Sequence, residues 1–213
     1  MILTEWEIAE RIISGEIVVS PILDPKQQFG PTSLDIRLGP DFRVVDSANL
    51  THLDPLLDPA EQLGQVSRYN RRVKVSPLEP FILHPGEFAL AASLEYVRIA
   101  PTISARVEGR SSWGRLGLLI HATAGFVDPG FSGSITFELH NVGPVPIPLY
   151  PGVRIAQLCF FPGSPTTLPY AQKQYTKYSG RIGAQESMYF ADPEYAIIRH
   201  RRQERITSGR LVD

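Results

Sequence analysis

The sequence predicts an all-β fold, either a barrel or a jelly roll. Many of its segments are short runs in which apolar and polar residues alternate, as in a strand with one buried face. The chain has 17 glycines and 19 prolines, and many of them stand between these runs, where they favour turns. A doubly wound α/β fold would instead require a helical pattern between the strands.

A short helix is predicted at the N-terminus. Thr4 and Glu7 have the spacing of a capping box, in which each side chain accepts the backbone N–H of the other residue. Ile8, Ile12 and Ile13 then form an apolar stripe at helical spacing, and Gly15 can end the helix.

The rest of the chain up to about residue 161 is typical of strands. The runs that predict them are residues 17–19, 33–38, 42–45, 72–75, 81–83, 87–92, 95–99, 104–108, 118–123, 134–138, 145–149 and 154–161.

Two segments interrupt or follow this pattern. Residues 46–70 are polar, contain Asp54-Pro55 and Asp58-Pro59, and keep no period, which predicts a long loop with a helical turn. Residues 191–213 are rich in arginine and predict a solvated helix or a subunit-docking arm in preference to a nucleic-acid site. We therefore expect one domain over residues 1–190 and a basic extension over residues 191–213.

Composition narrows the function. The chain has 213 residues, 43% of them hydrophobic and 20% charged, and a formal net charge of -1, which suits a globular protein without a general nucleic-acid surface. Any phosphate must then bind a local arginine cluster. Cys159 has no second cysteine to pair with and is expected to be a small core residue. With no leader and no apolar stretch long enough to span a membrane, a cytoplasmic protein is predicted.

The stretch from Glu108 to Asn141 carries the most chemistry. It contains Arg110, Arg115 and two adjacent serines, and it ends in a strand where Glu138 stands between Phe137 and Leu139. A carboxylate at such a position needs a cation, hydrogen-bond donors or a raised pKa. The candidate partners are Arg110, Ser111, Ser112 and Arg115. From spacing alone, a buried structural ion pair and a catalytic carboxylate are equally good interpretations.

These residues resemble a known family. Arg110-Ser111-Ser112-x-x-Arg115-Leu116-Gly117, the run Thr123-Ala124-Gly125-Phe126-Val127-Asp128-Pro129-Gly130-Phe131-Ser132-Gly133 and then Glu138 are similar to the motifs of dCTP deaminases in the dUTPase-like superfamily. Pro31 to Leu38, His84 to Phe88, Pro151-Gly152, Gln157-Leu158 and the late Tyr170, Lys177 and Tyr178 extend the resemblance over most of the chain.

The resemblance implies a distorted jelly roll of the β-clip, dUTPase-like type, assembled as a homotrimer with active sites between subunits. It implies that Glu138 shuttles the proton and that Ser111 and Arg115 of a neighbouring subunit orient water and charge. Residues implied to bind the substrate are Arg110, Ser112, Asp128, Thr136, Phe137, Gln157, Tyr170 and Lys177, with Asp128 on the deoxyribose 3′-hydroxyl and the backbone of residues 136–138 on the pyrimidine.

Each of these roles has a plainer alternative. Ser111 can be an ordinary helix N-cap, and Asp128 can be a turn-forming aspartate. Arg181 stands where the family usually has glutamine, in a tail of residues 179–183 that the resemblance expects to close over the nucleotide.

Zinc is not expected. The zinc deaminases need a Pro-Cys-x-x-Cys pair, and this chain has one cysteine. A carboxylate must then act without a metal on the water, and Mg²⁺ is expected only with the triphosphate, with no ligand from a protein side chain. The expected partners are dCTP and dUTP, with dTTP as an inhibitor acting near His121 and Ala122, and neither nucleic acid nor a membrane.

The expected reaction is deamination of dCTP to dUTP. The motif from Thr123 to Asp128 resembles the branch that goes on to dUMP and pyrophosphate, because deaminase-only enzymes typically have bulkier polar residues at the places of Gly125 and Phe126. A deaminase-only enzyme, a plain dUTPase and a non-catalytic nucleotide-binding regulator stay as alternatives. A dUTPase has no use for a carboxylate at position 138.

Overall fold

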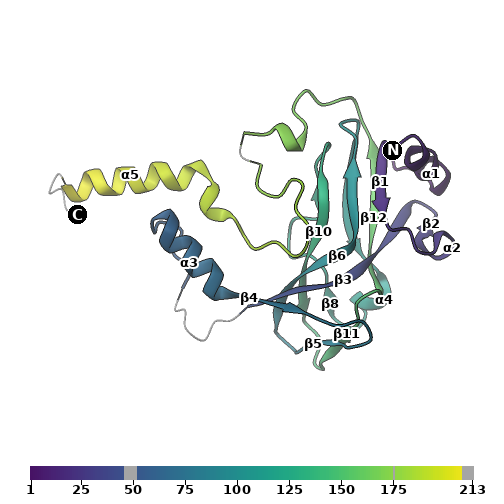
Figure 1. The fold of residues 1–213 in the computed structure, drawn as a ribbon, viewed down its shortest axis with the longest axis horizontal. Coiled ribbons are helices and arrows are strands. Elements are labelled where there is room, and N and C mark those ends of the chain that lie inside the picture. The colour runs from purple at the N-terminus through teal and green to yellow at the C-terminus, as the bar shows by residue number, and fades with distance from the viewer. Residues whose placement is uncertain (46–51, 175, 208–213) are drawn as a thin grey trace. The chain divides into compact units, whose positions relative to one another are not determined.

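A computed structural model describes residues 1–45, 52–174 and 176–207 (Figure 1). The chain divides into two compact units, residues 1–44 with 72–185 and residues 45–71 with 186–213, and each is described here by itself. Residues 45–71 thus group with the basic extension, while the domain boundary expected after residue 190 stays a prediction.

The first unit is built mainly of strands, which confirms the predicted all-β class. The strands are β1 (Ile17–Ser20), β2 (Phe29–Gly30), β3 (Ser33–Val45), β4 (Asn70–Lys74), β5 (Phe81–Leu83), β6 (Phe88–Ile99), β7 (Ile103–Gly109), β8 (Leu118–Leu119), β9 (Phe126–Val127), β10 (Ser132–Asn141), β11 (Ile147–Leu149) and β12 (Arg154–Pro162). Its helical segments are α1 (Glu5–Ile13), α2 (Pro25–Gln28), α4 (Ser111–Gly114) and the 3-10 turn η1 (Tyr170–Gln172).

Ten strands of the described residues form one hydrogen-bonded system, in the order β8-β10-β6-β3-β12-β7-β9, with β1 added on β6 and with β2 and β4 on β3. Strands β5 and β11 form a separate pair. Figure 1 shows β10 and β6 running side by side, with α1 next to β1.

Strand β3 holds this system together because it pairs with two partners along its length. Its first half pairs with β12, and the part from Leu38 to Val44 pairs with β6 after an irregularity between Leu38 and Phe42. Gly39 lies in the bend, where an added Cβ would come within 2.9 Å of the Ala92 carbonyl oxygen. The two strands predicted for residues 33–38 and 42–45 are therefore one bent strand, and those predicted for residues 87–92 and 95–99 are likewise the single strand β6.

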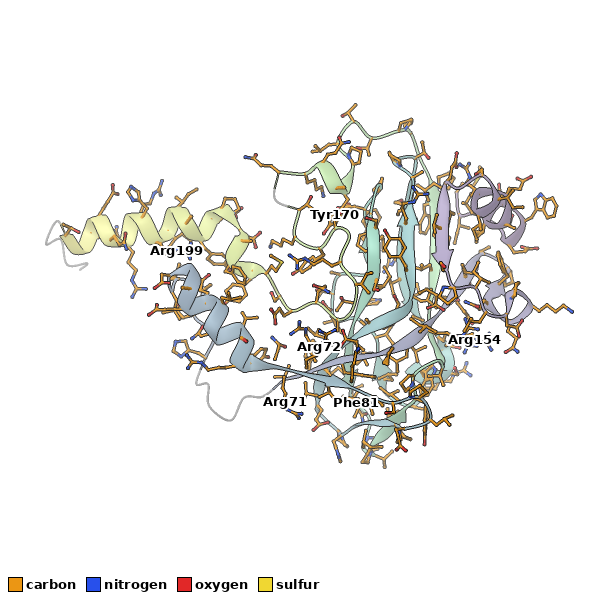
Figure 2. The ribbon with its side chains drawn as sticks, viewed as in Figure 1. Arg71, Arg72, Phe81, Arg154, Tyr170 and Arg199 are labelled. Carbon is orange, nitrogen blue, oxygen red and sulfur yellow. The ribbon has the colours of Figure 1, made fainter. Side chains whose placement is uncertain are left out.

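The apolar core follows the two-residue period of the strands. Leu34, Ile36 and Leu38 of β3 are completely buried, as is Phe42, whose ring stacks on Phe81 at a centroid distance of 4.4 Å. Phe81 is labelled in Figure 2. On β10, Phe137 and Leu139 are also fully buried. The same period corrects the expectation for Cys159, which lies between buried Leu158 and Phe160 and is itself only half-buried.

The N-terminal helix forms as predicted, with both bonds of the Thr4–Glu7 capping box present and Gly15 in a positive-φ conformation after its last turn. Ile13 does not belong to the buried stripe, because it is 87% exposed at the end of the helix. Strand β8 is shorter than the predicted residues 118–123, since the chain leaves the sheet after Leu119.

The second unit corrects the prediction of a long loop. Residues 46–51 lie outside the described residues, but α3 (Pro59–Tyr69) is a helix of 11 residues. Asp58 caps it by accepting the N–H groups of Ala60 and Glu61, and Pro59 occupies its first turn. That Asp-Pro pair was the signal for a helix start.

The same unit holds the 3-10 turn η2 (Tyr189–Ala191) and α5 (Pro193–Thr207), which confirms a helix in the basic extension. The Arg199 guanidinium donates to the Leu57 carbonyl oxygen at 2.9 Å. No helix among the described residues has both the length and the apolar character needed to cross a bilayer.

We expect Phe42→Ala to destabilise the protein by about 3–5 kcal/mol, because it removes a fully buried ring and leaves a cavity beside Phe81. Urea unfolding followed by tryptophan fluorescence measures the loss. Trp6→Phe, at a site that is 70% exposed, is the control and should leave the midpoint nearly unchanged. A midpoint for Phe42→Ala equal to that of wild type would show that this ring is not part of the core.

Candidate functional site

The Glu138 side chain lies on β10 between two buried apolar side chains and is itself partly exposed. Its Oε2 atom accepts a hydrogen bond of 2.7 Å from the backbone N–H of Ala122. The Glu138 N–H in turn donates to the Ile120 carbonyl oxygen at 2.9 Å, so the segment after β8 runs along this edge of β10. One carboxylate oxygen is thereby oriented, and the other can contact water or a ligand.

This contact corrects part of the sequence interpretation. Arg110, Ser111, Ser112 and Arg115 were the candidate partners of Glu138, but its partner in the chain is a backbone donor, and Arg110 pairs with Asp35 instead. In a single chain, the residues from Arg110 to Arg115 that suit phosphate and the Glu138 carboxylate are therefore two separate groups.

The first of these groups is the short helix α4. Arg110 is its N-cap residue, and no side chain caps this helix among the described residues, which excludes the N-cap role for Ser111. Ser111, Ser112 and Arg115 are exposed. Their hydroxyl and guanidinium groups are thus free to contact a ligand or a second chain.

The polar face of β3 lies next to α4, and its role was not predicted from the sequence. Ser33, Asp35 and Arg37 alternate with the buried leucine and isoleucine residues of this strand, yet they too are buried. The Ser33 hydroxyl donates to Gln157 Oε1 at 2.9 Å, and Gln157 is the register partner of Asp35 on β12. The predicted substrate residue Gln157 therefore belongs to this polar face.

Two arginines converge on Asp35. Its Oδ2 atom lies 3.2 Å from Arg110 Nε and 3.1 Å from Arg154 Nη1. Burial raises the pKa of the Asp35 carboxyl above its ordinary value, while the positive charges of Arg110 and Arg154 lower it in part. The strict alternation of Ser, Asp and Arg with Leu, Ile and Leu was the signal in the sequence that could have identified this cluster.

A pocket of about 540 Å³ opens at this place. Its lining includes the side chains of Arg37, Arg110, Ser112, Trp113 and Arg154, and Figure 2 labels Arg154 on β12. The volume is in the range of small-molecule sites, and three guanidinium groups suit an anionic ligand.

Asp128 lies in the turn after β9 and has a partner in the same chain. Its Oδ2 atom is 2.6 Å from Lys173 Nζ. Tyr170, labelled in Figure 2, packs against Phe131 with the ring centroids 5.7 Å apart, and its N–H donates to the Pro129 carbonyl oxygen at 2.8 Å. Burial raises the pKa of the Tyr170 hydroxyl, which is therefore a neutral hydrogen-bond donor near pH 7.

The tail that was expected to close over a nucleotide lies along β10 in this chain. The Ser134 N–H donates to the Arg181 carbonyl oxygen at 2.9 Å, and the Gln185 N–H donates to the Thr136 hydroxyl at 3.2 Å. The Lys177 carbonyl oxygen accepts from Arg181 Nε at 3.1 Å. Thr136 and Lys177, both predicted to bind substrate, thus contact the same segment. The Phe137 side chain is in the core, so only the backbone of Phe137 is available to a substrate.

Asp41 fixes the end of this segment. The buried Asp41 carboxylate accepts the Ala184 N–H at 2.9 Å and a bidentate interaction from Arg72 at 2.7 and 3.1 Å.

No group of three or more His, Cys, Asp or Glu side chains placed to hold a metal ion occurs in residues 1–45, 52–174 and 176–207.

Comparisons with known proteins identify relatives of this chain. Residues 2–163 match the family model described as dCTP deaminase-like. The chain is 42% identical over 184 residues to a protein of Dictyoglomus thermophilum named "dCTP deaminase, dUMP-forming", covering 86% of this chain and 92% of that protein. A protein of Nocardioides sp. with the same name is 46% identical, with the same coverage of both chains.

A protein of Halorubrum lacusprofundi named "dCTP deaminase" is 43% identical over 196 residues, covering 92% of this chain and 94% of that protein. Among solved structures, the 2'-deoxycytidine 5'-triphosphate deaminase from Agrobacterium tumefaciens is similar in fold, with a TM-score of 0.58 and 24% identity. That match covers 76% of this chain and 48% of the other.

We expect Asp41→Asn to loosen the segment of residues 180–185, because the amide cannot replace the charge-assisted bonds to Ala184 and Arg72. Hydrogen exchange of the Ala184 amide should become roughly tenfold faster or more. Asp24→Asn is the control, since Asp24 also accepts a backbone N–H, from Gln27 in α2. Unchanged exchange at Ala184 would show that Asp41 does not hold the segment.

Proposed function

The chain belongs to the dCTP deaminase-like family, and on this basis we propose that it hydrolyses dCTP to dUTP and ammonia and then dUTP to dUMP and pyrophosphate. Each step consumes one water molecule. The observation that carries the proposal is Glu138, a partly exposed carboxylate with one oxygen held by the Ala122 N–H. Such a group serves the first step and has no purpose in a plain dUTPase.

Glu138 performs the proton transfers of the deamination. Its carboxylate takes a proton from the attacking water, whose oxygen bonds to C4 of the cytosine, and delivers that proton to N3. It then carries the proton of the new C4 hydroxyl group to the amine, which leaves as ammonia while C4 becomes the carbonyl of uracil. The Ala122 N–H keeps the carboxylate in one orientation during both transfers. The proposal needs no zinc, because here the carboxylate alone activates the water, whereas in the zinc deaminases a metal ion activates the water and a glutamate moves the protons.

Arg110, Ser112 and the neighbouring guanidinium groups bind the triphosphate. Their donors match phosphate oxygens, and Arg110 and Ser112 face the pocket of about 540 Å³. The nearby Asp35 carboxylate is taken by two arginines, so the residues fit Mg²⁺ only as an ion held by the phosphate oxygens and water. In that place Mg²⁺ would reduce the charge on the triphosphate.

The second step uses the turn that contains Asp128. We propose that Asp128 binds the 3′-hydroxyl of the sugar in exchange for Lys173, and that Gln157, Tyr170 and Lys177 complete the nucleotide site. Relatives of similar identity carry either name, "dCTP deaminase, dUMP-forming" or "dCTP deaminase", so identity alone does not decide whether dUMP is formed. The small Gly125 favours the dUMP-forming branch. The product would be a precursor of thymidine nucleotides, and dTTP is the proposed inhibitor.

The active site is proposed to lie between subunits of a homotrimer. Ser111 and Arg115 are exposed on α4, and Glu138 has its partner on another segment. Large apolar residues near them are also exposed, Leu116 by 56%, Leu119 by 44% and Phe126 by 62%. Exposed apolar groups of this kind mark association surfaces. A second chain would cover them and bring its Ser111 and Arg115 to Glu138.

The test of the function is to incubate the protein with dCTP and Mg²⁺ and to resolve dCTP, dUTP, dUMP and pyrophosphate over time. We expect dUMP and pyrophosphate with little free dUTP. Accumulation of dUTP would reduce the protein to a deaminase, and hydrolysis of dUTP without consumption of dCTP would make it a dUTPase. Added dTTP should slow turnover, and unchanged kinetics would show that dTTP is not an inhibitor.

Glu138→Gln should lower kcat for ammonia release by about 10²–10⁴-fold, the usual contribution of a general acid–base group, with dCTP still bound. Coupled ammonia detection and calorimetric titration measure the two effects. Glu87→Gln is the matched control, because Glu87 also accepts a backbone N–H, from His84 at 2.8 Å, but lies outside the proposed site. Normal turnover in Glu138→Gln would remove this residue from the mechanism.

Mixing two inactive variants tests the shared site. Glu138→Gln and Arg115→Gln subunits, unfolded and refolded together in equal amounts, should recover about one quarter of wild-type activity, because in random closed trimers that fraction of sites receives both intact residues. Each variant refolded alone should stay inactive. If the mixture also stays inactive, Glu138 and Arg115 do not act across an interface.

A further inference from the structure

Strand β3 buries charge on the face opposite its apolar residues. Asp35 is 8% exposed and Arg37 is 7% exposed. Charged side chains buried to this degree need partners of opposite charge or several hydrogen bonds. Arg37 has one partner of opposite charge, Glu95, at 3.2 Å. Asp35 has two such partners, Arg110 and Arg154, and both line the pocket.

The cluster around Asp35 leaves positive charge at the pocket. A single carboxylate oxygen serves both Arg110 and Arg154, so one negative charge meets two positive ones. Because both guanidinium groups also line the pocket, the remaining positive charge is available to an anion there. If oppositely charged groups neutralised both arginines, the cluster around Asp35 would have only a structural role.

Arg110 is held at two of its three side-chain nitrogens. Nε contacts Asp35 at 3.2 Å, and Nη1 donates to the Arg154 carbonyl oxygen at 3.2 Å. Within the described part of the chain, Nη2 has no such partner. Since a guanidinium group is planar and rigid, these two contacts fix the direction in which Nη2 points.

Arg154 links the same cluster to α4. Its carbonyl oxygen accepts the Trp113 Nε1–H at 2.9 Å, and its guanidinium group contacts both Asp35 and Gln27. Trp113 lies inside α4, one residue after Ser112. The positions of the Ser111 and Ser112 hydroxyl groups therefore depend on the backbone of Arg154, whose side chain Asp35 holds.

We propose that Asp35 is a positioning residue for the triphosphate: it fixes the Arg110 guanidinium group and, through Arg154, the position of α4. This inference rests on the proposed function and adds to it a buried residue that touches no part of the substrate. An ordinary structural ion pair would have a different signature, because its loss would lower stability without acting on phosphate affinity through Arg110.

The experiment is a double-mutant cycle with Asp35→Asn and Arg110→Ala, with KM and kcat for dCTP measured on each folded variant. Asp35→Asn alone should raise KM about tenfold, the worth of one charge-assisted contact, with a much smaller change in kcat. In the Arg110→Ala background the same change should raise KM by a clearly smaller factor, because only the route through Arg154 remains. Inhibition by inorganic tripolyphosphate should weaken by the same factor as KM rises.

An equal factor in both backgrounds would overturn the positioning role, as would an unchanged KM and tripolyphosphate inhibition in Asp35→Asn. Thermal unfolding is recorded for each variant, and if Asp35→Asn does not fold, Asp35→Ser, which leaves room for water between the arginines, takes its place in the cycle. Wild-type protein is the internal standard. Lack of dCTP turnover by wild type would refute the proposed function itself, whereas normal wild-type turnover with an additive cycle refutes only the role of Asp35.

Discussion

The carboxylate of Asp35, shared by Arg110 and Arg154, is the interaction on which the site depends most. It lies on a strand with two buried faces, so the apolar core and the polar cluster are built from alternate residues of the same segment. A shift of β3 by one residue would put Asp35 into the core and Ile36 against the arginines. The need to bury both faces correctly therefore fixes the register of β3 and, with it, the approach of β12 and α4.

The sequence was a good guide wherever the signal was local. The capping box at Thr4, the two-residue period of the strands and the helix in the basic extension all rest on neighbouring residues, and the structure confirms them. The continuity of β3 through Gly39 could not be predicted, because a glycine and a proline read as a break unless the Ala92 carbonyl that approaches the bend is known. The helix α3 was missed because an Asp-Pro pair was interpreted as a turn, although it also begins helices.

The site was predictable in its residues more than in its contacts. Motif spacing pointed to Glu138 and to the run from Arg110 to Arg115, but it could not give the contacts that each group makes within one chain. In the chain, Glu138 is oriented by the Ala122 N–H and Arg110 by Asp35, which is 75 positions earlier in the numbering. Pairings across such separations are set by strand order, which no local pattern contains. The same limit explains why Gln157 was selected without its partner Ser33.

The ion pair between Asp128 and Lys173 has a consequence for selectivity. In the free chain an ammonium group already occupies the carboxylate that is proposed to receive a sugar hydroxyl. A ligand must therefore offer more than shape, since it has to replace a charge by a neutral donor and give the displaced lysine a new partner, for which its phosphates are suited. A nucleoside without phosphates can donate its sugar hydroxyl to Asp128 but cannot give Lys173 a new anionic partner. Discrimination between nucleosides and nucleotides would then begin at the sugar, by an exchange of partners and not by a steric barrier.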